Sequence, residues 1–304
     1  MMKLNNLNFA DITQRLESQM LLPKLTEQII QSMLDEDINI AQLAAQIAQE
    51  QAIVVRTLRV ANSPFYGLSR QVDNLESAII ILGFRTIRNI AFGVSLTHAF
   101  KKTSTFNQHT FWQHAIAVGS AARHLARLKK QNTEMAFTAG LLHNIGKLAL
   151  GSVFSEEYKA VMAYQETHDV PLLTAEKTIL GLDHTEIGAH LTKTWNLPPS
   201  LIDVVAFCHH PSQTNAKTAD YAEKADFAEC ADSARIPNTT TDIIHIARAI
   251  APALHLAEKD PKHTAVPPLD DGAWRRLSFN PDALSATFAN IINDYTDLSL
   301  ALLE

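Results

Sequence analysis

The chain has 304 residues, of which 46% are hydrophobic and 19% charged, with a formal net charge of −6. This composition excludes a disordered chain and is enough for one large domain or two modest ones. Lys and Arg are scattered among acids and form no basic stripe, so we expect no specific binding of nucleic acid. Two cysteines, Cys208 and Cys230, suggest no disulfide framework and favour a reducing compartment.

No apolar run approaches the roughly 20 residues that a membrane helix needs. Residues 1–11 also lack the apolar core of a signal segment. We therefore expect a cytoplasmic protein with no membrane partner.

The N-terminal third has helical periodicity. Apolar residues recur three and four positions apart over 25–34 and 40–58, which predicts two helices. The run Asn62-Ser63-Pro64 then favours a turn, and a loop is expected as far as Val72. Asn74 or Asp73 is expected to cap a helix that ends at Gly83, and a further helix is expected over 86–98.

Polar residues at 101–107 indicate a boundary, after which helical patterns resume. The helices predicted in this part span 111–130, 133–142, 156–168, 172–180, 184–196, 199–208, 241–256, 274–277 and 282–303. Residues 212–240 form a polar stretch to which no function is assigned. The sequence thus predicts an all-α protein, divided into an N-terminal lobe (1–100), a helical bundle (101–260) and a C-terminal extension (261–304).

Thirteen histidines are present, and spacing separates five of them from the rest. His114, His143, His184 and the pair His209-His210 lie at or near helix ends whose other face is apolar, as in metal sites inside helical bundles. The alternative is that His143 and His184 are hydrogen-bonded core residues. The default expectation for the other eight is a place on the surface: His98, His109, His124, His168, His190, His245, His255 and His263.

Several motifs, in a fixed order over residues 21–211, resemble the HDOD family, the HD-related output domains of bacteria. They are LPKL (22–25), LRVANSPFYG (58–67), AIIILGF (78–84), WQHA (112–115), AGLLHNIGKLAL (139–150), GLDHTEIGAHL (181–191), WNLP (195–198) and HHP (209–211). The resemblance implies an N-terminal helical lobe packed on a bundle of the HD phosphohydrolase type.

The resemblance also implies a degenerate metal site. Asn144 stands where active HD enzymes have an aspartate that bridges two metals, and Arg248 stands where a second aspartate is expected. An amide is a weak metal ligand, and a guanidinium has no lone pair to donate. The half of the site with His114 and His143 should therefore bind no cation, whereas His184, His209 and His210 leave one divalent metal conceivable.

Two further positions bear on ligands. Lys147 stands where a lysine often contacts a substrate phosphate in related enzymes, although a solvated lysine at a helix end is an equal reading. With Arg248 it is a candidate anion contact. The GYP sequence that marks cyclic di-GMP phosphodiesterases is absent after His209-His210, which argues against that nucleotide as a substrate.

Three functions are compatible with this pattern: a non-catalytic regulatory module, a phosphohydrolase with one metal, and a sensor of nucleotides or other anions. The first is favoured, with no required cofactor and with a signalling protein or a small ligand as partner. The loop residues Asn62, Ser63, Phe65 and Tyr66 are the candidate partner surface, with a turn and a local aromatic anchor as the alternative. No receiver, kinase or cyclase motif is present, so input is expected from separate molecules.

Overall fold

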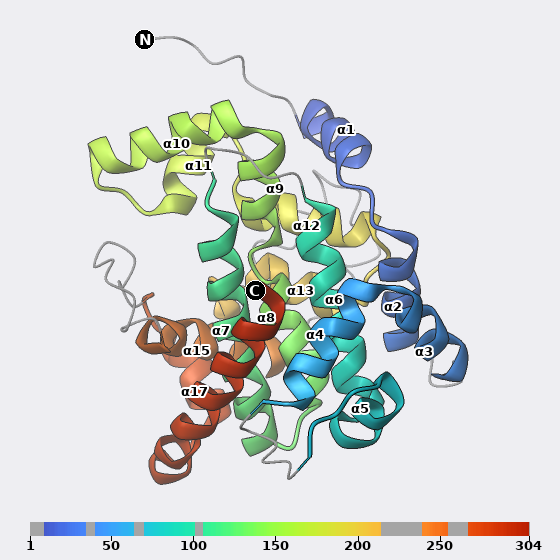
Figure 1. Ribbon diagram of the computed structural model, residues 1–304. Helices are drawn as coiled ribbons and strands as arrows, with labels where there is room; N and C mark the ends of the chain where they lie inside the picture. The colour runs from blue at the N-terminus through green and yellow to red at the C-terminus, as the bar shows by residue number, and fades with distance from the viewer. Residues whose placement is uncertain are drawn as a thin grey trace.

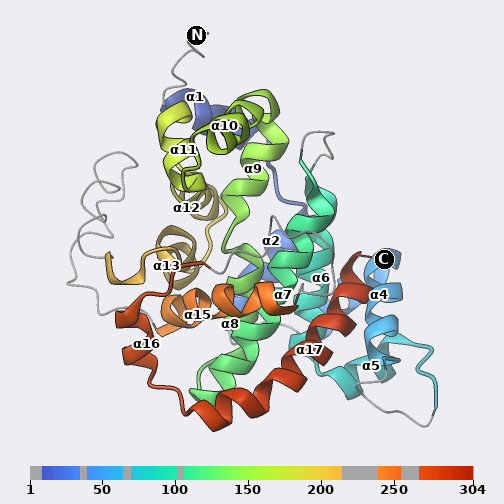
Figure 2. The ribbon, with the colours of Figure 1, turned by 90° about the vertical axis from the view of Figure 1, so that its left-hand side faces the viewer.

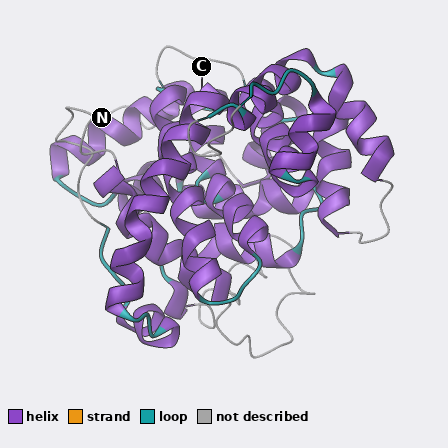
Figure 3. Cartoon of the chain, turned by 60° about the horizontal axis from the view of Figure 1, so that its bottom comes forward, coloured by secondary structure: helices purple, strands orange, loops and turns teal. Residues whose placement is uncertain are grey.

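The computed structural model describes residues 9–34, 40–63, 70–100, 106–213, 239–254 and 267–303. Within these ranges, every element of regular secondary structure longer than one residue is a helix (Figure 3). The predicted all-α class is confirmed. Phe65, Tyr66 and most of the 212–240 stretch lie outside the described residues.

Six helices form the N-terminal lobe (Figure 1): α1 (Phe9–Gln19), α2 (Lys24–Leu34), α3 (Ile40–Gln49), α4 (Gln51–Ala61), α5 (Leu75–Leu82) and α6 (Phe84–Ala99). The single helix predicted over 40–58 is wrong, because the backbone leaves the helical region at Glu50, at φ −93° and ψ 92°. The sequence analysis also missed α1, which buries Ile12 and Leu16, one turn apart, in an otherwise polar segment.

The turns around α5 follow their predicted chemistry. The Asn74 side chain accepts a hydrogen bond from the backbone N–H of Ser77 at 2.8 Å and so caps α5. Gly83 ends the helix at φ +76°, a left-handed value that glycine adopts without strain.

The remaining helices form the HD-type bundle and the C-terminal extension (Figure 2): α7 (Gln108–Leu128), α8 (Thr133–Leu142), α9 (Ile145–Val153), α10 (Ser155–His168), α11 (Leu172–Leu180), α12 (His184–Thr194), α13 (Pro199–Phe207), the short 3₁₀ helix η2 (Pro211–Gln213), α15 (Thr239–Leu254), α16 (Asp271–Leu277) and α17 (Pro281–Leu303). Helix α9 had not been predicted. Its two glycines, Gly146 and Gly151, weaken a helical pattern, and both lie where a neighbouring segment approaches closely.

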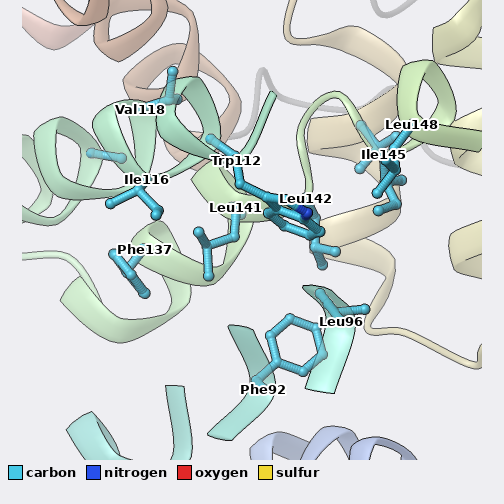
Figure 4. Packing of buried hydrophobic residues seen from close by; sticks show 14 of the residues in the cluster. Phe92, Leu96, Trp112, Ile116, Val118, Phe137, Leu141, Leu142, Ile145 and Leu148 are labelled. Atoms are coloured by element: carbon cyan, nitrogen blue, oxygen red, sulfur yellow. The ribbon is translucent and has the colours of Figure 1, made fainter. Parts of the chain in front are cut away.

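The N-terminal lobe packs directly on the bundle, as the resemblance implied. Figure 4 shows Phe92 and Leu96 of α6 beneath Trp112 and Leu142 of the bundle, and all four are buried. A second contact is polar: the Arg15 guanidinium on α1 donates to the carbonyl oxygen of Val153 at 3.0 Å.

Helix α17 joins the two lobes. It packs against α7 and reaches α4, so that the C-terminus lies beside α4 (Figure 2). Nη1 of Arg123 on α7 donates to both carboxylate oxygens of Asp294, at 3.0 and 3.2 Å, and Ser63 donates to Asp297 at 2.9 Å. The C-terminal extension is therefore part of the packed body; the boundaries at 100 and 260 remain predictions.

None of the single helices that the structure describes is both long and apolar enough to cross a membrane, although α5 together with α6 up to Thr97 meets the criteria of length and composition as a pair bent by 113°.

Candidate functional site

The site lies where α8, α9, α11, α12, α13 and α15 meet. His184 is the first residue of α12, His209 follows the end of α13, and Arg248 lies in the middle of α15. His143 and Asn144 connect α8 to α9. Helix α12 packs on α9 and α13, and α13 on α15 (Figure 2), so these five side chains are drawn from separate parts of the sequence.

Close backbone packing holds α12 against α9. A Cβ atom on Gly146 would overlap the carbonyl oxygen of His184, and one on Gly188 would lie 2.7 Å from Val205. The prediction that Gly188 permits close approach is confirmed. The crossing fixes the distance between the start of α12, with His184, and the start of α9, with Asn144.

Four side chains form a continuous chain of hydrogen bonds across the site. The Nδ1 atom of His184 lies 2.7 Å from Oε2 of Glu176, and its Nε2 lies 3.1 Å from Nε2 of His209. The Nδ1 atom of His209 lies 3.0 Å from Nη2 of Arg248. The chain therefore runs Glu176–His184–His209–Arg248, through α11, α12, the end of α13, and α15.

Elementary donor and acceptor rules fix the proton on each ring. A guanidinium only donates, so Nδ1 of His209 accepts and, in the neutral ring, Nε2 of His209 carries the proton. That proton is donated to Nε2 of His184, and Nδ1 of His184 then donates to the Glu176 carboxylate. Asn144 Oδ1, 3.5 Å from Nε2 of His209, is a second, weaker acceptor for the same proton.

The surroundings keep the His209 ring neutral. Burial lowers its pKa well below the usual histidine range, and the positive charge of Arg248 lowers that pKa further. Burial also lowers the pKa of Arg248, but a guanidinium starts so high that it stays charged. The Cys208 carbonyl, at the end of α13, accepts from Arg248 Nη1 at 2.9 Å and stabilises that charge.

His143 lies beside this chain with one ring nitrogen unpaired. Its Nδ1 donates to the Gly140 carbonyl at 2.7 Å, so Nε2 carries a lone pair. This Nε2 is buried and has no hydrogen-bond partner within the described residues, and neither has Nε of Arg248. The His143 ring stands 5.4 Å from that of His114, between centroids. Burial, followed by His114 and Arg248, lowers the pKa of His143 well below its usual range.

Two other predicted residues lie at the edge of the cluster. His210 is half-buried in the turn after α13, where its backbone N–H donates to the Phe207 carbonyl at 2.9 Å. Lys147, in the first turn of α9, is half-buried, and burial lowers the pKa of its ammonium group. The negative charge of Glu176 raises that pKa, and the positive charge of Arg248 lowers it.

The sequence and the fold agree on the family. The HDOD domain model matches residues 20–211. This chain belongs to the HDOD family. An uncharacterized protein of Treponema pallidum (strain Nichols) is 26% identical to this HDOD chain over 203 residues, which are 66% of the chain and 39% of that relative. The chain thus spans about two fifths of the length of that relative.

Solved structures share the fold. A candidate phosphohydrolase from Shewanella amazonensis SB2B superposes with a TM-score of 0.72 at 21% identity, covering 96% of this chain and 97% of that one. An HDOD domain protein of unknown function from Geobacter sulfurreducens has a TM-score of 0.70 at 20% identity, with 94% and 97% coverage. A candidate signal transduction protein from Marinobacter aquaeolei VT8 has a TM-score of 0.69 at 19% identity, with 99% and 67% coverage.

The donor set of this HDOD site does not fit a metal as it stands. Within the described residues, no group of three His, Cys, Asp or Glu side chains is placed to hold an ion. The spacing of His184 and His209 would suit two ligands of one metal, but a metal needs the lone pair of His209 Nε2. That lone pair exists only if Nδ1 carries the proton, and Nδ1 faces the guanidinium of Arg248.

The loop residues proposed as a partner surface are used inside the HDOD fold. The Asn62 carboxamide donates to the carbonyl oxygens of Leu58 and Val72 and accepts from the Val72 N–H, at 2.7 to 2.8 Å. Ser63 is buried against Asp297. For these two residues the structure favours the alternative, a turn held from within; Phe65 and Tyr66 are outside the described residues.

Three residues of the HDOD core were missed or misplaced by sequence reasoning. Glu176, fully buried, was not singled out, because glutamate is almost never fully buried unless it is paired. His124 and His245 had been assigned to the surface, and this is wrong: His124 lies 3.6 Å from Asp294. His245 donates from Nδ1 to the Cys208 carbonyl at 2.8 Å and accepts from the Asp270 N–H at 2.8 Å.

Proposed function

We propose that this HDOD protein is a non-catalytic regulatory module in which a hydrogen-bonded chain has replaced the metals of the HD site. One observation carries the proposal: Arg248 donates to Nδ1 of His209 and thereby places the proton on the ring nitrogen that would bind a metal. Asn144 adds no negative charge to offset a divalent cation.

Within the described residues, no group of His, Cys, Asp or Glu side chains is placed to hold the metals of a two-metal phosphohydrolase, which supports the proposal. Such an enzyme needs cations that activate water and clamp the attacking and leaving oxygens. His209 is held as a donor, and a guanidinium lies 3.0 Å from its ring. This ring therefore does not help to hold such cations. Output must then pass through binding, to a signalling protein or a small ligand.

A sensor of anions in the same cluster is the second candidate. It is supported by two cations in the same cluster, Arg248 and Lys147, which lie close enough to repel each other, and by the Nε–H of Arg248, which has no partner within the described residues. Binding of inorganic phosphate that is lost in Arg248→Met would favour this candidate over the first.

The test of the main proposal is direct. Purified protein, with any affinity tag removed, is analysed for bound metal and incubated with Zn²⁺, Mn²⁺ or Fe²⁺ and two substrates, bis(p-nitrophenyl) phosphate and cyclic di-GMP. We expect no stoichiometric metal and hydrolysis at the background rate. Tight binding of metal at one or two ions per chain, with turnover that His184→Ala abolishes, would overturn the proposal.

A further inference from the structure

A cavity of about 480 Å³ lies between the two lobes, away from the histidine chain. One wall comes from α2 and α3 of the N-terminal lobe, and the other from the C-terminal end of α12 and the residues that follow it. In Figure 1, α2 and α3 lie together at the edge of the molecule. The volume of the cavity is typical of a binding site for a small organic molecule.

The polar lining of this interlobe cavity is dominated by carboxamides. Gln28 on α2, Gln42 and Gln46 one turn apart on α3, and Asn196 after α12 all line it. Gln28 and Gln46 are half-buried, and within the described residues their side chains have no hydrogen-bond partner. Each carboxamide offers a donor and an acceptor side by side, so these groups suit a ligand edge that alternates acceptor and donor.

The charges and the apolar surface narrow the ligand class. Lys24 and Glu27 are the two charged residues that line the interlobe cavity, and their charges cancel. This excludes a polyphosphate or a divalent cation as the main recognised group. The apolar part of the wall includes Leu43 and the indole of Trp195, a flat surface on which an aromatic ring can stack.

Trp195 is held in place. Its indole N–H donates to the Met20 carbonyl at 3.1 Å, and its ring meets that of Phe100 edge to face, with centroids 6.3 Å apart. Both partners belong to the N-terminal lobe. The indole therefore links the two lobes beside the interlobe cavity and is held rigid there.

We propose that the interlobe cavity binds a nucleobase, stacked on Trp195 and read along its hydrogen-bonding edge by Gln28 and Gln46. The proposal goes beyond the regulatory role above, because it assigns a ligand site that shares no residue with the histidine chain. It also gives the ligand a route to that chain: α12 begins at His184 and ends at Thr194, which lines the cavity.

The experiment uses the full chain and four nucleosides, adenosine, guanosine, cytidine and uridine, each to about 1 mM, the weak end of specific affinity. Binding is measured by calorimetry and by saturation-transfer NMR, with ribose and glucose as sugar controls. We expect at least one nucleoside to bind and neither sugar to do so. Gln46→Ala should weaken binding about tenfold, the order of one lost bidentate contact.

Gln49→Ala is the matched control, since Gln49 is exposed on the same helix outside the cavity lining; it should leave binding unchanged. If Gln46→Ala lowers the midpoint of urea unfolding, nucleoside binding is measured instead for Gln28→Ala, on α2, where the same weakening is expected. The proposal is overturned if no nucleoside binds the wild type, if ribose or glucose binds as well as the nucleoside, or if both glutamine variants bind like the wild type.

Discussion

Replacing Arg248 by methionine is expected to turn the His184–His209 pair into a metal-binding pair. Methionine keeps an unbranched apolar side chain but removes every donor and the positive charge. Nδ1 of His209 can then carry the proton, which frees Nε2, 3.1 Å from Nε2 of His184, as a ligand. The Glu176 carboxylate already accepts from Nδ1 of His184 and so fixes the orientation of its ring, as carboxylates do for histidines that bind metals.

The gain follows from the charge that is removed. A guanidinium roughly 7 Å from a dication opposes its binding by about 5 kcal/mol at an effective dielectric of about 20, which is roughly three to four orders of magnitude in Kd. The double variant with Asn144→Asp adds a carboxylate close to His209 and should bind more tightly again.

Co²⁺ and Zn²⁺ titrations followed by calorimetry, with the visible absorption of Co²⁺ as a second readout, measure this gain. Arg275→Met is the control, because it removes the same charge from an exposed position on α16. If Arg248→Met binds these metals no more tightly than the wild type, Arg248 does not control the protonation of His209, and the reasoning fails.

Three further outcomes follow from the packing and the charges. Gly146→Ala should lower the free energy of unfolding by about 2–3 kcal/mol, because the added Cβ overlaps α12. Gly93→Ala, whose Cβ would meet only ordinary contacts from 3.4 Å, should leave it unchanged. Urea unfolding measures both variants. Asp294→Asn should cost about 2 kcal/mol in the same assay, because buried Arg123 on α7 loses the nearer of two carboxylates and keeps Glu134, at 3.6 Å; an unchanged midpoint would contradict this. The free energy of unfolding should fall as the pH drops below about 6.5, by up to about 1.4 kcal/mol per pH unit for each of His143 and His209. The reason is that the pKa values of both residues are lowered in the folded state, so only the unfolded chain takes up the protons. A urea midpoint that rises towards pH 5 would refute this.

Periodicity predicted most helices, because apolar residues three and four apart must share a buried face. It failed where a boundary carries no turn residue: nothing in the run around Glu50 marks the break between α3 and α4. It failed also for α9, where Gly146 is required by the approach of α12, a contact that only the folded chain reveals.

Only part of the site was predicted from the sequence, because some of its contacts form only in the folded chain. His143, His184 and His209 were grouped by their places at helix ends and by the resemblance, and the structure brings them together. Glu176 lies eight residues before His184, with Leu172 and Leu180 four positions to either side on the same helix face, but a buried carboxylate is rare, so it was not singled out. His245 could have been found, because it lies three residues before Arg248 in an apolar run and so shares its helix face.

The hydrogen-bond chain also explains how a buried arginine is tolerated at this place in the bundle. An unpaired buried charge costs several kcal/mol, and a direct partner for Arg248 would have to be a carboxylate. Here a carboxylate, Glu176, is separated from Arg248 by two imidazoles, each donating to one neighbour and accepting from the other. The two rings orient their dipoles between the cation and the anion, so the pair is stabilised across the width of the site. Loss of either ring would leave both charges without that bridge, and His184→Ala should therefore destabilise the fold more than a cavity of one imidazole would.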